Sequence, residues 1–247
     1  MSAPTAPVIA AGGLDEESAA DLAAAALALA RRFAAGATLW CVSPSWAPHA
    51  HHVAVEFVHP VVVGKRALPA VAVTGPDPVA MARVSVRPGD VILAVAAASD
   101  PEVCSMMRRA QAWGAATVWI GNGPRPPAGA ADHVLWLEDP DPALPVTGRF
   151  VLLYHLLWEL THVCFEHPGL LTPADPECEG ETCVTCGDEG RIGEVISPRM
   201  PDDGRALVRT ATGRELVDTL LVEPVEAGDL ILVHAGSAIT RLDGDGA

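Results

Sequence analysis

The chain has 247 residues, which is enough for one ordinary domain and a smaller second one. Hydrophobic residues make up 50% and charged residues 19%, so the chain can form a core and is not of the disordered class. The formal net charge is −15, and Lys65 is the only lysine. We therefore expect no nucleic-acid partner, because binding a phosphate backbone requires a basic surface.

The amino-terminal segment gives no sign of export. Three acidic residues, Asp15, Glu16 and Glu17, precede the alanine-rich stretch 19–30, where a secretory signal would carry basic residues. No window approaches the roughly 18 uncharged apolar residues that a membrane span requires. We expect a cytoplasmic protein without a membrane partner.

Residues 15–166 alternate between helical and strand-like patterns, which predicts a parallel sheet with helices on both faces. The predicted fold class is therefore α/β, with a three-layer domain over residues 1–167. Strands are expected at 38–42, 70–73, 91–95, 117–120 and 134–137, and helices at 15–33, 47–58, 101–113 and 149–166.

The rest of the chain has a different character. Residues 168–181 are rich in proline, glycine and acidic residues, which is typical of a linker. In residues 182–247, short β-rich runs are separated by Gly-containing turns, and we expect a small all-β, OB-like barrel. Its strands are expected at 195–196, 206–208, 220–222 and 230–233.

Three of the six cysteines stand singly in apolar segments. These are Cys41, Cys104 and Cys164, and we expect them to be buried as small hydrophobic side chains.

The other three cysteines, Cys178, Cys183 and Cys186, fall within nine residues. In a cytosolic chain this spacing indicates metal or redox chemistry before structural disulfides. His234 ends a later apolar run, and thiolate and imidazole groups are good ligands for iron or zinc. Cys183, Cys186 and His234 are the candidate ligands; the alternatives are half of a structural zinc site or an inert thiol pair.

The stretch 228–239, GDLILVHAGSAI, resembles the HypC/HupF family of nickel-iron hydrogenase maturation chaperones. The resemblance implies a carrier of an iron fragment bearing cyanide and carbonyl, which works with a HypD-like scaffold protein and serves the hydrogenase large-subunit precursor. His234 would be the family's strand histidine and Cys183 its thiolate, with Cys186 as the alternative. The cysteine is internal here, whereas in the family it follows the initiator methionine.

The first domain resembles the sugar isomerase (SIS) fold, and within it phosphoheptose isomerase, through the stretches 50–57, AHHVAVEF, and 87–95, RPGDVILAV. The resemblance implies a homo-oligomer and a zinc site with His52 and Glu56 as ligands. The last helix offers His155, Glu159 and His162 as further ligands, with the register left open. The alternative for this histidine and glutamate cluster is a buried polar network without a metal. An active isomerase would use Glu56 and His162 as base and acid.

The turns that would hold a phosphate depart from this pattern. Ser43, Ser45 and Ser99 are the candidate substrate-binding residues, but Pro44 removes an amide donor and Asp100 adds a repelling charge. We therefore expect the first domain to serve dimerization or docking more than isomerization.

The favoured hypothesis is a non-enzymatic maturation factor and metal-fragment carrier whose acidic surface recognises its partners. The alternatives are a sugar-phosphate isomerase and a zinc-stabilised module that senses a phosphosugar.

Overall fold

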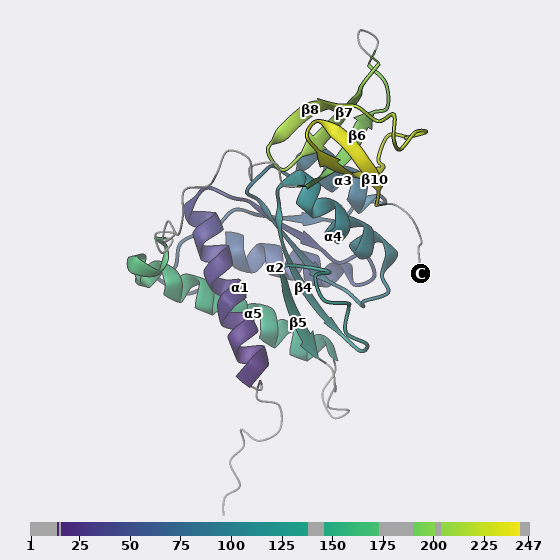
Figure 1. Ribbon diagram of the computed structural model, residues 1–247. Coiled ribbons are helices and arrows are strands. Elements are labelled where there is room, and N and C mark those ends of the chain that lie inside the picture. Colours follow the sequence, from purple (N-terminus) through teal and green to yellow (C-terminus); the bar gives the residue numbers. More distant parts are fainter. Residues whose placement is uncertain (1–13, 15, 138–145, 173–189, 201–203, 243–247) are drawn as a thin grey trace, which may run out of the picture.

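The computed structural model describes residues 14, 16–137, 146–172, 190–200 and 204–242. Its larger part is a five-stranded, wholly parallel sheet in the order β2-β1-β3-β4-β5, covered by helices on both faces (Figure 1). This confirms the predicted three-layer α/β class. The strands are β1 (Leu39–Val42), β2 (Ala70–Val73), β3 (Val91–Val95), β4 (Ala116–Asn122) and β5 (His133–Leu137).

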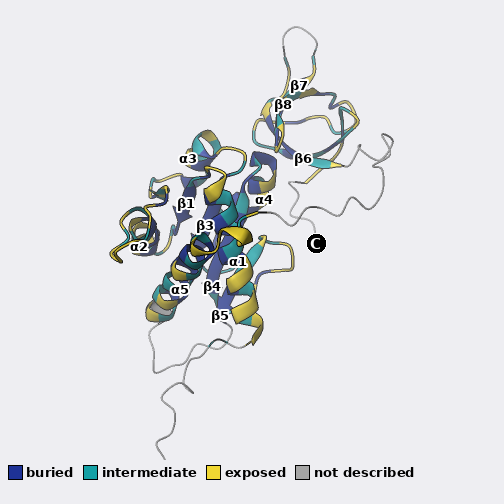
Figure 2. Ribbon diagram, turned by 90° about the vertical axis from the view of Figure 1, so that its left-hand side faces the viewer, coloured by how far each residue is buried: buried dark blue, intermediate teal, exposed yellow. Residues whose placement is uncertain are grey.

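The helices divide between the two faces according to which strand residues point toward them. Helices α1 (Glu16–Ala34), α2 (Ala47–Val58) and α5 (Val146–Glu166) share a core with Leu39 and Leu93. Helices α3 (Pro78–Ser85) and α4 (Pro101–Trp113) pack on the opposite face, against Ile92. Figure 2 shows the central strands buried between helices whose outer faces are exposed.

Local signals determine where the helices begin and end. Helix α1 has Glu16 and Glu17 in its first turn and Arg31 and Arg32 in its last, which matches the helix dipole. Helix α4 starts at Asp100, whose side chain caps it, and ends at Gly114, whose left-handed φ of 72° lets the chain turn away. Glycine is needed at that position because other residues rarely adopt such a φ.

The carboxy-terminal part is a separate antiparallel sheet in the order β10-β9-β6-β7-β8. A bridge between Asp218 and Ser237 joins the end of β8 to β10, so the sheet turns back on itself. This is consistent with the small β domain predicted from the sequence. Its strands are β6 (Arg191–Ser197), β7 (Ala206–Thr210), β8 (Gly213–Val217), β9 (Leu230–His234) and β10 (Ser237–Arg241).

One strand was predicted wrongly. The run 220–222 lies in a turn: the Asp218 carboxylate accepts a hydrogen bond from the amide of Leu220, and Leu220 and Leu221 are 75% and 78% exposed. Aspartate favours such turns by bonding its own backbone two residues on. The missing strands are β8, which ends just before Asp218, and β10.

The short helix η1 (Pro168–Leu170) follows α5, at the start of the predicted linker. Among the described residues, no helix is long and apolar enough to cross a membrane.

Candidate functional site

Helices α2 and α5 bring three predicted ligands together. His52 Nε2 lies 3.3 Å from Glu56 Oε1, His155 Nε2 lies 3.4 Å from the same oxygen, and the two imidazole nitrogens are 3.2 Å apart. A tetrahedral zinc ion with bonds of about 2.0–2.1 Å separates its ligand atoms by about 3.3–3.4 Å. The triangle therefore has the dimensions of one face of such a site.

Tyr154 holds the first of these ligands in place. Its hydroxyl lies 2.8 Å from His52 Nδ1 and 3.4 Å from Nδ1 of the buried His49. Burial, with the charge of Glu56, raises the pKa of Tyr154 to about 12, so the phenol is neutral. Burial lowers the pKa of His49, whose neutral ring can accept from the phenol. The phenol can then accept from His52 Nδ1–H, which leaves the Nε2 lone pair directed at the triangle.

The structure also settles which residues of α5 join the cluster. His162 is buried, with Nδ1 2.9 Å from the carbonyl oxygen of Trp158 and Nε2 3.0 Å from that of Arg66. Glu159 lies 3.3 Å from Lys65 Nζ. Neither lies in the triangle, so the geometry favours His155 among the three candidate ligands of α5 and separates His162 from Glu56. Helical spacing placed all three candidates on one side of α5 but could not choose among them.

In the candidate phosphate-binding turns, hydroxyl and amide groups that could bind a phosphate are already hydrogen-bonded within the protein. Ser43 Oγ donates to a main-chain carbonyl of β3 at 2.7 Å, and Ser45 Oγ donates to Asp100 Oδ2 at 3.0 Å. The other Asp100 oxygen accepts two amides of the first turn of α4, at 3.2 and 3.1 Å. A carboxylate thus takes the amides that would bind a phosphate, and Ser99 is exposed beside it.

His234 ends β9 and leads into a tight hairpin. Ala235 and Gly236 have φ of 50° and 75°, the left-handed pair that a two-residue hairpin with matching twist requires. Arg191 pairs with Val233, and continuing this register by one residue sets Gly190 opposite His234. Cys183 and Cys186 lie outside the described residues.

The three single cysteines have the surroundings expected of structural thiols. Cys41 and Cys164 are buried as expected, whereas Cys104 is only half-buried, and its Sγ donates to a carbonyl oxygen at 3.2 Å. Burial raises the pKa of all three thiols, which keeps them protonated and unreactive.

Sequence reasoning missed the polar centre that joins the two domains. Glu194 of β6 is 1% exposed and accepts hydrogen bonds from Arg83 Nε at 2.8 Å, Arg109 Nη1 at 3.1 Å and Trp113 Nε1 at 2.7 Å. All three donors come from α3 and α4 of the other domain. The one available signal was an acidic residue flanked by glycine and valine within a β-rich run.

Comparisons with known proteins agree with this architecture. The α/β domain is similar to a phosphoheptose isomerase from Francisella tularensis, with 16% identity and a TM-score of 0.52 over 60% of this chain and 90% of that one. Phosphoheptose isomerase GmhA from Neisseria gonorrhoeae is 16% identical over 62% of this chain and 86% of that one, with a TM-score of 0.45. No curated protein sequence matches the chain.

The protein is thus a fusion of an SIS-like α/β domain, with the fold of phosphoheptose isomerases, and a small β domain. Residues 191–247, which hold this β domain, match the model of the HupF/HypC family.

Proposed function

We propose that the protein is a maturation factor of nickel-iron hydrogenase whose β domain carries an iron fragment bearing cyanide and carbonyl. The iron is cargo, taken up with a HypD-like scaffold protein and passed to the large-subunit precursor. The observation that carries this proposal is the HupF/HypC match over residues 191–247, which includes the stretch around His234. In this proposal the α/β domain serves self-association or docking in the cytoplasm.

The register of β6 and β9 supports a shared role for the thiols and the imidazole. Gly190 falls opposite His234, and Cys186 stands four residues before Gly190 in the chain. Four residues span at most about 14 Å, and the seven residues back to Cys183 at most about 25 Å. The connecting chain is therefore short enough to limit how far either thiol can lie from His234, and thiolate with imidazole is a ligand set that iron accepts.

Infrared spectroscopy tests the carrier role. The tagged protein would be purified without oxygen from cells making hydrogenase, and the region of metal-bound cyanide and carbonyl bands recorded. We expect bands in the native protein and in Cys104→Ala, a control in α4, and no bands in Cys183→Ala. Bands that persist in Cys183→Ala and vanish in Cys186→Ala would move the ligand to the second thiol. A preparation without bands and without a bound hydrogenase partner would contradict the proposal.

The triangle in the α/β domain favours a second role, a resident zinc ion. His52, Glu56 and His155 offer the donor types and separations that zinc requires. With three protein ligands, a bound zinc would leave one position open, where it could polarise water or a ligand. The closure of the phosphate turns by Asp100 argues against sugar-phosphate isomerization as its use.

Cobalt substitution tests the zinc site, because tetrahedral cobalt absorbs visible light strongly. We expect one equivalent to bind with intense bands, and His155→Ala to abolish them. Glu159→Ala, a change on the same helix outside the triangle, should leave them intact. Equal spectra for the two variants would contradict the assignment.

A further inference from the structure

The β domain is seated firmly on the α3 and α4 face of the α/β domain (Figure 1). Leu230 of β9 is buried in the same core as the apolar residues of α4, and Ile192 of β6 packs at its margin. Glu194 adds the three hydrogen bonds to Arg83, Arg109 and Trp113 beside them. Apolar burial and a satisfied buried charge together fix the two domains, so a site between them has a defined shape.

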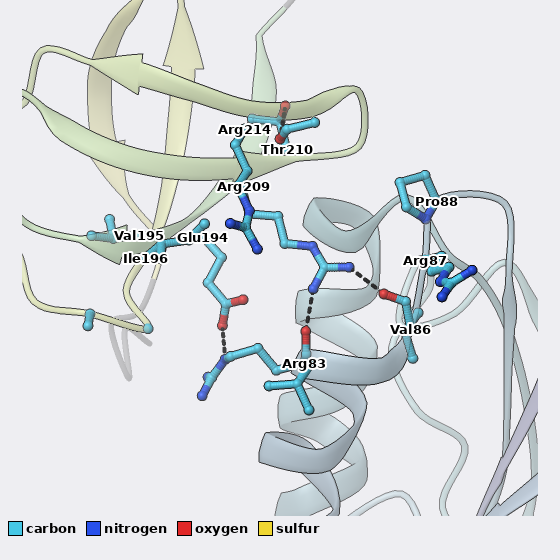
Figure 3. Close-up of a pocket in the computed structure, with 14 residues that line it drawn as sticks. Arg83, Val86, Arg87, Pro88, Glu194, Val195, Ile196, Arg209, Thr210 and Arg214 are labelled. Atoms are coloured by element: carbon cyan, nitrogen blue, oxygen red, sulfur yellow. Dashed lines mark hydrogen bonds and ion pairs between the residues drawn. The ribbon is translucent and has the colours of Figure 1, made fainter.

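A pocket of about 490 Å³ opens at this junction. Its size is typical of pockets that hold small organic ligands. Arg83 and Arg87 line it from the α/β domain, and Arg209 and Arg214 from strands β7 and β8 of the β domain. Figure 3 shows Glu194 meeting Arg83, and Arg209 reaching the main-chain oxygens of Arg83 and Val86, with the side chain of Arg87 at the rim farther from the β domain.

The positive charge of this pocket is not balanced by its own residues. Glu194 is the one carboxylate among the described residues that line it, and it is engaged by Arg83. Arg209 gives its hydrogen bonds to two main-chain carbonyls, of Arg83 and Val86, which carry no full charge.

The pKa of Arg209 reflects the same excess of positive charge in the pocket. Burial lowers the pKa of its guanidinium, and the charges of Arg214 and Arg83 lower it further against the opposing effect of Glu194. The side chains of Arg87 and Arg214 are exposed and have no hydrogen bond or ion pair within the described part of the chain. Four arginines thus line a pocket whose one carboxylate is already paired with Arg83, in a protein of net charge −15.

The pocket is not a remnant of an isomerase site. Ligands of open α/β sheets bind beyond the carboxyl ends of the strands. Val86, Arg87 and Pro88 lie just before β3, at the amino-terminal edge of the sheet. Most of the lining residues come from the β domain, so the site exists only in the fused chain.

We propose that this junction pocket binds a phosphorylated small organic molecule. The guanidinium groups of Arg87 and Arg214 are the free donors, and their planar geometry suits paired hydrogen bonds to phosphate oxygens. Val84, Val86 and Ile196 give the pocket apolar walls against which the organic part packs. This favours an organic phosphate over an inorganic anion.

Calorimetric titration of the intact protein tests the proposal, with ADP, fructose 1,6-bisphosphate and pyrophosphate as probes and adenosine as the uncharged comparison. We expect at least one organic phosphate to bind below about 1 mM and more tightly than pyrophosphate, and adenosine not to bind. Arg87→Ala and Arg214→Ala should each weaken that binding about ten-fold or more, the usual effect of losing a charge-assisted hydrogen bond.

Arg108→Ala is the matched control, since Arg108 is exposed on α4 and lies outside the pocket. It removes the same charge and should leave the affinity unchanged. Because Arg87 and Arg214 hold no partner, their variants should melt at the temperature of the native protein. Binding of none of the phosphates, tighter binding of pyrophosphate, or equal losses in Arg108→Ala and the pocket variants would overturn the proposal.

Discussion

Replacing Glu194 with glutamine tests how the two domains are held together. The glutamine has the same shape but carries no charge. The native carboxylate is 1% exposed and accepts from Arg83, Arg109 and Trp113. The substitution therefore leaves the two guanidinium groups without their countercharge.

The expected loss of stability follows from the exposure of the partners. Breaking a buried charge pair from one side costs about 3–5 kcal/mol. Arg83 is 38% exposed and Arg109 16% exposed, so water screens part of the change. The glutamine oxygen also keeps one acceptor. We expect Glu194→Gln to lower the free energy of unfolding by about 2–3 kcal/mol.

Urea unfolding followed by tryptophan fluorescence measures this loss, because Trp113 lies at the junction. With a slope of about 2 kcal/mol per molar urea, the midpoint should fall by about 1–1.5 M. Glu215→Gln is the control, because it removes an ion pair between two partly exposed side chains, Glu215 (27%) and Arg191 (38%). It should lower the free energy of unfolding by about 1 kcal/mol or less. Equal shifts for the two variants would refute a buried, charge-dependent junction.

Two further predictions concern single residues. Tyr154 is the sole tyrosine, so its ionisation can be followed by ultraviolet absorbance. We expect a titration midpoint near pH 12 instead of 10, and a loss of folding stability as the pH rises between these two values. A midpoint near 10 would contradict the burial of this side chain. Gly193→Ala should cost about 1–3 kcal/mol, because its new methyl group would lie 2.4 Å from a side chain of the facing strand. Gly148→Ala, with open space around it, should instead stabilise helix α5 by about 0.5 kcal/mol; thermal unfolding of both variants checks the contrast.

The α/β fold was readable from the sequence because its strands are short apolar runs bounded by glycine, proline and helix caps. The strand at 91–95 and the helix at 101–113 were predicted with the observed bounds. The β domain was harder. Strand β8, GRELV, carries two charged residues and buries only Val217, whereas the run 220–222 is more apolar and yet largely exposed in a turn set by Asp218. Hydrophobicity indicated the wrong segment because a side-chain hydrogen bond determined the local structure.

The triangle of candidate ligands was predicted in part for a related reason. Spacing of four residues places His52 and Glu56 on one side of α2, and this is local information. The third ligand depends on how α5 packs across α2, which no local pattern encodes. His155 meets the pair, while His162, about two turns further along the helix, is held by carbonyl oxygens instead.

The charged residues at the two edges of the parallel sheet have opposite effects on an anion: Asp100 disfavours one at the start of α4, and the arginines of the junction pocket favour one. In the α/β domain, Asp100 caps α4 with its own carboxylate, and this closes the amides that a phosphate would use. At the opposite edge of the sheet, contact with the β domain gathers arginines that neither domain assembles alone. A ligand that binds there contacts both domains at once and therefore stabilises their docked arrangement by its binding free energy. A phosphorylated ligand should accordingly raise the urea midpoint of the native protein more than that of the Arg214→Ala variant, and this gain should grow with ligand concentration.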